Sequence, residues 1–198
     1  MSTSVPEPDT QLFRDAMASF ASGVNVISVW DVQGRPYGMT VSAFASVSIA
    51  PQLVLVCLNR ECRTYLQIRR ARAFGVNILG LQGQEIADHC SQPGVDKTLP
   101  GDWLCRPAAA DHSGQQSAPE LREALAFLGC SVHSEVLAGG HSILLGSVKS
   151  IRLGEGGPAP LVYYRGGYRR ISEHPDGPPC AAAARTHPDI RENRKVQA

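Results

Sequence analysis

The chain has little net charge and no long apolar run, and these two absences exclude several classes of protein. Its 198 residues carry a formal net charge of only +1, so no overall field attracts it to nucleic acid or to a membrane surface. No apolar run reaches the roughly 18 residues that a membrane-spanning helix requires. The first ten residues are polar and lack the apolar core of a signal peptide. We therefore expect a cytoplasmic protein that binds neither nucleic acid nor membrane.

Several catalytic and metal-binding motifs are also missing. The sequence has no GxGxxG after a strand, no GxxxxGK[ST] phosphate loop and no GxSxG nucleophile turn. Its six cysteines are scattered, without a CxxC pair, and so predict reduced and mostly buried thiols rather than a disulfide scaffold or a zinc site. Five histidines stand in no informative pattern and receive no role: His89, His112, His133, His174 and His187.

The hydrophobic content, 43%, is sufficient for one domain with its own core. We expect a flexible N-terminus over residues 1–9 and a folded domain over residues 10–172. Residues 173–198 are rich in proline, alanine and mixed charge and show no strand or helix period, so we expect a disordered tail.

Apolar patterns in the domain predict many strands and a few short helices. Strands are expected over Val24–Trp30, Tyr37–Ser48, Leu53–Leu58, Ala73–Leu79, Leu128–Leu137, His141–Leu153, Leu161–Tyr164 and Tyr168–Ile171. Helices are expected over residues 10–22, 63–70, 84–90 and 119–128, and a long loop over residues 91–118. Gly139-Gly140 between two apolar runs indicates a hairpin. Strands joined by turns, with helices packed outside them, predict a mainly β protein with an antiparallel barrel.

The stretch from Tyr37 to Ser48 carries the most informative pattern. Small hydroxyl residues recur in it, including Thr40, Ser42 and Ser46, and alternate side chains of a strand point to one face. Such a face offers hydroxyls and accessible backbone, against which a flat polar cofactor can lie. The alternative is that these residues merely occupy a half-exposed strand, since threonine favours strands in any case.

Two further features suit a polar ligand. The segment from Asn59 to Thr64 follows a strand and opens a helix, so it combines arginines, a hydroxyl and backbone amides of the kind that bind phosphate. A solvated turn with surface arginines is the alternative. Asn77 is a single amide in an apolar strand, and a buried amide needs partners. It either caps a bend or contacts a ligand.

The order and spacing of these segments resemble the flavin reductase-like proteins, which have an FMN-binding split barrel. The matching stretches run from Phe13–Met17 to Gly166–Tyr168 and cover most of the chain. The resemblance implies an NAD(P)H:flavin oxidoreductase that transfers hydride from NADH or NADPH to FMN or FAD. It also implies a homodimer and a flavin-dependent monooxygenase that receives the reduced flavin.

The resemblance assigns residues to the site. Those implied to contact the flavin ring are Met39, Thr40, Val41, Ser42, Ala43, Cys57, Leu58 and Asn59; those implied at the phosphate are Cys62, Arg63 and Thr64; and Asn77, Tyr164 and Tyr168 are implied nearby. His141 is implied to lie over the flavin near the nicotinamide and is the candidate catalytic residue. Two departures stand out, because Cys62 replaces a usual serine and Gly140 replaces a usual acidic residue. No metal is implied.

Two other functions fit the same fold. One is a non-catalytic flavin- or haem-binding protein, and the other is a flavin oxidase that retains its cofactor, like the pyridoxamine-phosphate oxidase relatives. A reductase needs no catalytic triad, because both reacting groups belong to cofactors.

Overall fold

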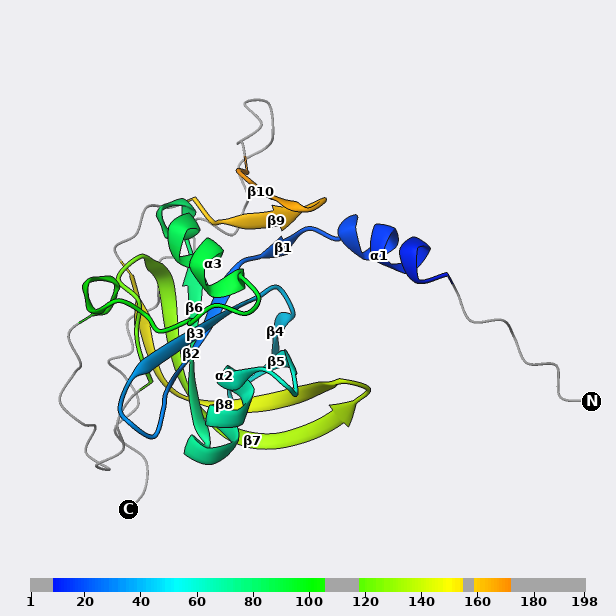
Figure 1. Cartoon of the computed structure of the whole chain (residues 1–198). Helices are drawn as coiled ribbons and strands as arrows, with labels where there is room; N and C mark the ends of the chain where they lie inside the picture. The colour runs from blue at the N-terminus through cyan, green and yellow to red at the C-terminus, as the bar shows by residue number, and fades with distance from the viewer. Residues whose placement is uncertain (1–8, 106–117, 155–158, 172–198) are drawn as a thin grey trace, which may run out of the picture.

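A computed structural model gives the fold and describes residues 9–105, 118–154 and 159–171 (Figure 1). The strands are β1 (Ser22–Gly23), β2 (Asn25–Trp30), β3 (Pro36–Val41), β4 (Phe44–Ser48), β5 (Leu53–Asn59), β6 (Ala73–Leu79), β7 (Ala124–Ala138), β8 (His141–Leu153), β9 (Val162–Tyr164) and β10 (Gly167–Arg169). The helices are α1 (Thr10–Ala18), α2 (Arg63–Ala71) and α3 (Gln84–Ser91), with short 3-10 turns at Leu81–Gly83 and Gly101–Trp103. The expected disordered tail lies outside the described residues, as does nearly all of the expected flexible N-terminus.

The main sheet has seven antiparallel strands in the order β3-β2-β6-β7-β8-β5-β4, and a smaller sheet has the order β1-β9-β10. β3 and β4 follow one another in the chain, yet they form opposite edges of the main sheet. The chain passes between the edges at Ser42 and Ala43, where the Ala43 carbonyl accepts a hydrogen bond from the Cys57 amide at 3.0 Å. We call this crossing, residues 42–43, the edge link. The sheet is not closed by hydrogen bonds, and its strongly curled form confirms the predicted mainly β, split-barrel class.

Helix α2 lies against the concave side of the curled sheet (Figure 1). Its side chains Tyr65 and Ile68 are 2% and 0% exposed and join a cluster that includes Ile27 and Phe74 from β2 and β6. Close packing here requires Gly146 on β8, because a Cβ atom at that position would lie 2.6 Å from the Phe74 ring. The concave side is therefore filled by α2.

A second cluster covers the other face of β2. Val26 and Ile27 point to opposite faces of this strand, so Val26 packs in the second cluster with Ile86 and Cys90 of α3. The Thr40 hydroxyl donates to the Ala87 carbonyl at 2.7 Å and fastens β3 to α3. β2 is consequently buried on both sides.

Three expectations about local structure are wrong. The expected helix over residues 119–128 is replaced by an irregular segment and the start of β7, which pairs with β6 on one side and β8 on the other. Tertiary pairing here overrides the helical pattern of an Ala- and Leu-rich segment. The expected single strand from Tyr37 to Ser48 breaks at the edge link into β3 and β4, so Thr40 and Ser42 line one pocket while Ser46 belongs to a different strand. Helix α1 also ends at Ala18, earlier than expected.

Asn77 is held entirely by protein groups. Its side chain is fully buried, and its amide donates to the Val26 carbonyl at 3.1 Å and the Ser28 hydroxyl at 3.0 Å. Its oxygen accepts from the Leu121 amide at 2.8 Å. Asn77 thus joins β2, β6 and the segment before β7.

Within the described residues, none of the helices combines the length and apolar character that crossing a membrane would take. The same residues contain no group of three or more side chains suited to hold a metal ion.

Candidate functional site

A pocket of about 310 Å³ opens between the start of α2 and the loop formed by residues 93–97. Its lining consists of Tyr37, Met39, Cys62, Arg63, Thr64 and the five loop residues. The Cys62 sulfur caps the helix by accepting from the Tyr65 amide at 3.4 Å. The amides of Arg63 and Thr64 begin the helix and have no carbonyl acceptor within it, and the Thr64 amide is bonded to the Cys62 sulfur. The start of a helix favours an anion, although Asp96 adds a carboxylate to the lining. We call this cavity the α2 pocket.

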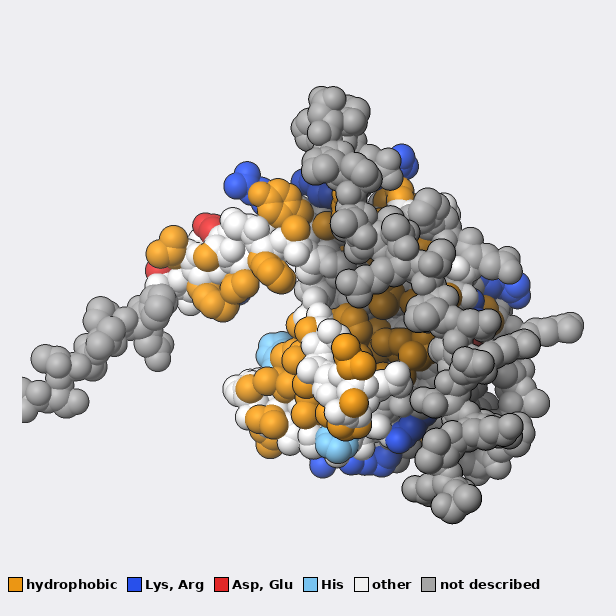
Figure 2. Space-filling view, turned by 180° about the vertical axis from the view of Figure 1, so that it is seen from behind, with side chains coloured by type: hydrophobic (Ala, Val, Ile, Leu, Met, Phe, Trp, Pro, Cys, Tyr) orange, Lys and Arg blue, Asp and Glu red, His pale blue; other side chains and the backbone are white. Residues whose placement is uncertain are grey.

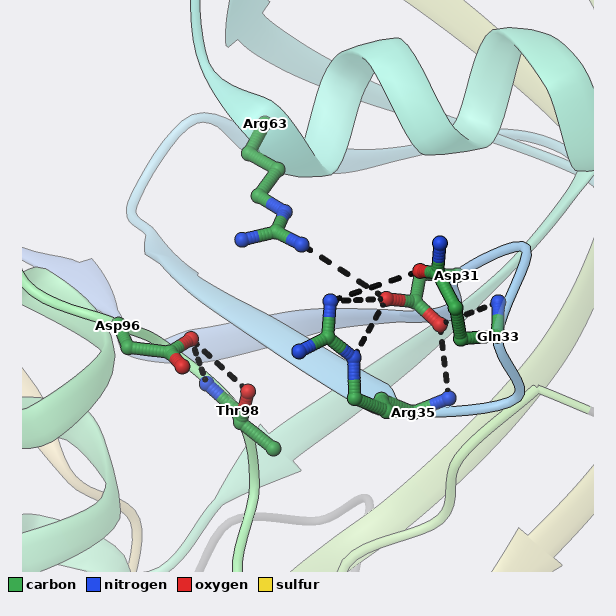
Figure 3. A network of polar contacts seen from close by, with 6 residues as sticks. All are labelled: Asp31, Gln33, Arg35, Arg63, Asp96 and Thr98. Carbon is green, nitrogen blue, oxygen red and sulfur yellow. Dashed lines mark hydrogen bonds and ion pairs between the residues drawn. The ribbon is translucent and has the colours of Figure 1, made fainter.

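The Arg63 side chain leaves α2 and extends toward the turn between β2 and β3 (Figure 3). Its guanidinium lies 4.2 Å from the centroid of the Tyr37 ring and 3.7 Å from the Asp31 carboxylate. Half of the side chain remains exposed, at 51%, so the charge stays available at the pocket. Arg63, which the family resemblance assigns to the phosphate, therefore lies at a helix start that favours anions.

Asp31 organises the turn beneath Arg63. Its carboxylate is inaccessible to solvent and accepts from the amides of Gln33 and Arg35 at 2.9 and 2.8 Å. The Arg35 guanidinium adds a hydrogen bond and an ion pair, both at 2.9 Å (Figure 3). Burial acts to raise the pKa of Asp31, but the hydrogen bonds from Arg35 and Gln33 outweigh it and lower that pKa.

The residues implied for the flavin ring are divided between two places. Met39 lines the α2 pocket, whereas Thr40, Val41 and Ser42 line a second pocket of about 390 Å³ together with Tyr168. Successive side chains of β3 point to opposite faces, which separates Met39 from Thr40; Val41 packs in the same cluster as Met39 but also borders the second pocket. Ser42 itself is exposed at the edge link.

Ala43, Cys57 and Asn59 gather near the edge link and the start of α2. The Ala43 carbonyl accepts from the Cys57 amide next to the pairing of β4 with β5, and the Asn59 side chain accepts from the Glu61 amide at 2.8 Å. His141 is exposed at the start of β8, where it is the register partner of Asn59. The structure thus brings the predicted catalytic residue to the end of the sheet where α2 begins.

Three predicted residues lie apart from this group. Leu58 and Asn77 are both fully buried, so neither side chain is open to a ligand. Tyr164 belongs to the smaller sheet, and the Arg165 guanidinium lies 5.4 Å from the centroid of its ring.

Sequence reasoning missed Tyr37, Lys97, Asp31 and Asp96, all of which contribute to the α2 pocket or its wall. Tyr37 reads as an ordinary strand aromatic, and Asp31 as an ordinary turn residue. The polar run from Asp96 to Thr98 was the only signal for the loop, and it lay within a segment expected to be irregular.

The Asp31 network predicts a pH-dependent contribution to stability. Because the pKa of Asp31 is lower in the folded state than its unfolded value of about 3.9, its contribution is present above that pH and is lost as the pH falls through the folded pKa. We expect Asp31→Asn to be less stable than the parent in urea unfolding at about pH 5–7, with a gap that narrows below about pH 4. Asp102→Asn, on an exposed turn, is the control; a gap that does not change with pH would contradict the assignment.

Comparison with known proteins places this site in context. The family described as flavin reductase like domain matches residues 17–172. The reductase component of 4-nitrophenol 4-monooxygenase/4-nitrocatechol 2-monooxygenase from Rhodococcus opacus is 39% identical over 84% of this chain and 84% of its own length. The NADH:riboflavin 5'-phosphate oxidoreductase of Streptomyces pristinaespiralis is 36% identical over 81% of this chain and 87% of its own.

A solved structure agrees with these relatives. The NADH:FAD oxidoreductase SgcE6 of Streptomyces globisporus C-1027, in complex with NAD and FAD fragments, superposes with a TM-score of 0.70 at 26% identity. The match covers 88% of this chain and 100% of that one. The match over residues 17–172 spans both β-sheets, α2 with its pocket and His141, and the chain therefore belongs to the flavin reductase like domain family.

Proposed function

We propose that this protein is an NAD(P)H:flavin oxidoreductase that reduces FMN or FAD and supplies the reduced flavin to a partner monooxygenase. The observation that carries the proposal is the α2 pocket. It lies at a helix start, which favours anions, and at the same end of the sheet as His141. When bound, the flavin supplies a ring that accepts hydride from NADH or NADPH.

The side chains present fit a flavin at this end of the sheet. The opening amides of α2, with Thr64 and the Arg63 guanidinium, suit the phosphate. Ser42 and Ala43 are exposed small residues at the edge link, where a planar ring has room to lie.

The polar groups at this site suit a flavin that binds reversibly and is replaced by another after reduction. Most are backbone amides or half-exposed side chains, and such contacts each contribute little net binding energy. A flavin that leaves after reduction must be captured by another protein, and the similar protein from Rhodococcus opacus is named as the reductase component of a monooxygenase. We place the reaction in the cytoplasm, where reduced nicotinamide is available.

A steady-state assay tests the function. Purified protein with NADH or NADPH and excess FMN or FAD should consume the nicotinamide at a rate proportional to protein. Absence of turnover with every pairing would favour a non-catalytic flavin- or haem-binding protein. A yellow cofactor that stays with the protein through gel filtration would instead favour a flavin oxidase.

His141 is expected to position the nicotinamide for hydride transfer. His141→Ala should slow anaerobic flavin reduction in stopped flow by roughly tenfold to a hundredfold, because small losses of alignment are costly. Flavin affinity, measured separately by titration, should stay within about twofold. His133→Ala, another exposed histidine in the same hairpin, is the control, and a variant as fast as the parent would remove His141 from catalysis.

We also propose that the protein is a homodimer in which α1 packs on a second copy. Apolar side chains gather along α1, which extends away from the body of the molecule (Figures 1 and 2). Leu12, Phe13, Met17 and Phe20 are each at least half exposed, and α1 itself contains no buried residue. An isolated helix of this length is marginal in water, so a covering partner is required to stabilise it.

Light scattering coupled to gel filtration should give the mass of two chains. Leu12→Ser combined with Phe13→Ser should shift the equilibrium toward the monomer at low protein concentration, since it removes apolar area from the contact. Arg14→Ser, on the same helix, should leave the dimer intact. A double variant that remains fully dimeric would place the dimer contact elsewhere.

A further inference from the structure

A third cavity, of about 320 Å³, lies between the second half of α2 and the turn that follows β2. Its polar lining residues are Asp31, Gln67 and Arg70, and the rest of its wall is Trp30 with small or branched apolar side chains such as Val29. It shares no lining residue with the α2 pocket or with the pocket beside Tyr168. We call it the Trp30 cavity, and no part of the proposed reaction takes place in it.

The cavity exists because two neighbouring strands have different lengths at this end of the sheet. The pairing of β2 with β6 stops at Ser28 and Gly75, whereas β2 continues alongside β3 as far as Trp30. Helix α2 ends at Ala71. Ala71 and Ala73 line the gap that results, and their single methyl groups are too short to fill it.

Gln67 brings a buried amide to the cavity. The residue is only 8% exposed, it lines the cavity, and no hydrogen bond joins its side chain to another described residue. An amide carries two donors and an acceptor, and burying it without partners is unfavourable. Asn77, by contrast, finds all of its partners inside the protein. The partners of the Gln67 amide must therefore come from within the cavity.

Arg70 adds a positive charge at the rim. It follows Gln67 by three residues on α2, so the two side chains lie on the same face of the helix. Arg70 is exposed and forms no ion pair with a described residue. The Asp31 side chain is inaccessible to solvent and is paired with Arg35, so it leaves Arg70 free. The last turn of a helix has partial negative charge, and an anion at this place therefore needs the Arg70 cation.

We propose that the Trp30 cavity is a second ligand site, which binds a small carboxylic acid with a flat apolar body, such as an aromatic acid. The Arg70 guanidinium and the Gln67 amide donate to the carboxylate, and the apolar body lies against Trp30 and Val29. One cation above an apolar wall suits a monoanion of this kind. The Asp31 carboxylate lies 3.7 Å from Arg63, so the site borders the turn that supports the α2 pocket without overlapping that pocket.

Titration with sodium benzoate, followed by tryptophan fluorescence, tests the inference. The chain has two tryptophans, and Trp103 packs edge-on against His89 in another part of the fold. In a Trp103→Phe background, where Trp30 is the only indole, benzoate should change the fluorescence saturably with a Kd of about 0.1–1 mM. Calorimetric titration of the parent chain should give the same Kd, which checks that the background substitution leaves the site intact.

Substitutions at the two donors should weaken binding. Arg70→Gln should raise the Kd for benzoate by about tenfold, and Gln67→Leu, of similar size, by about fivefold, because each removes a hydrogen bond to a charged group. Arg69→Gln is the matched control, since the Arg69 guanidinium lies 5.9 Å from the centroid of the Tyr65 ring, and it should change the Kd by less than about twofold. Benzamide, which has the same ring without the charge, should bind at least about tenfold more weakly than benzoate.

Three results would overturn the inference. The first is the absence of saturable benzoate binding by both fluorescence and calorimetry. The second is an equal loss in Arg69→Gln and Arg70→Gln, or no loss in Arg70→Gln, either of which would place the benzoate elsewhere on the protein. The third is loss of benzoate binding when the protein is saturated with FMN, which would mean that benzoate occupies the flavin site.

The inference stands or falls separately from the proposed function, because the titrations of the parent and the variants use neither flavin nor nicotinamide. A protein that binds benzoate as described but reduces no flavin would refute only the proposed function. A protein that reduces flavins but does not bind benzoate would refute only the second ligand site.

Discussion

The edge link at residues 42–43 is the constraint on which the rest of the structure depends. It joins β3 and β4, which occupy opposite edges of a seven-stranded sheet, so the sheet must curl until its edges approach one another. Only a curled sheet has a concave side that α2 can fill with Tyr65 and Ile68. The start of α2 follows β5, which is hydrogen-bonded to the edge link through Cys57 and Ala43, so the place of the proposed flavin site follows from the way the sheet is connected.

One carboxylate ties the two sides of that site together. The hydroxyls of Tyr65 and Ser142 both donate to Glu135, each at 2.6 Å, and these hydrogen bonds from Ser142 and Tyr65 hold the pKa of Glu135 below its ordinary value. Tyr65 follows Thr64 in the chain, and Ser142 follows His141. The group proposed for phosphate binding and the group proposed for hydride transfer are therefore each one residue from the same anchor.

Local patterns predicted the parts of the fold that depend on neighbours in the sequence. β5, β6, α2 and α3 begin and end within about two residues of their expected bounds, because each has a clear apolar period and a turn or cap at its ends. The segment from Pro119 to Leu128 failed, since its pairing with β6 and β8 brings together residues far apart in the chain. Propensity carries no information about such partners.

The candidate site was predictable from the sequence only at the strand-to-helix junction where α2 begins. Cys62, Arg63 and Thr64 stand at a strand-to-helix junction that the sequence displays directly, and the structure lines a pocket with them. Tyr37 and Lys97 reach the same pocket only because the loop pairs with the edge of β3, at Tyr37 and Thr98. Neither residue type nor spacing could indicate that pairing, which is why two donors of the site were not identified.

Asn77 and Tyr37 show why burial alone does not reveal function. Both are polar side chains with almost no exposed area, and both lie on strands next to β2. The amide of Asn77 finds three partners within the protein, so its polarity is fully explained by holding strands together. The hydroxyl of Tyr37 faces the Asp96 carboxylate, where hydrogen bonds from Thr98 and from this hydroxyl lower the pKa of Asp96. Partners within the fold thus account for both polar groups, so burial by itself marks neither side chain as a ligand-binding group.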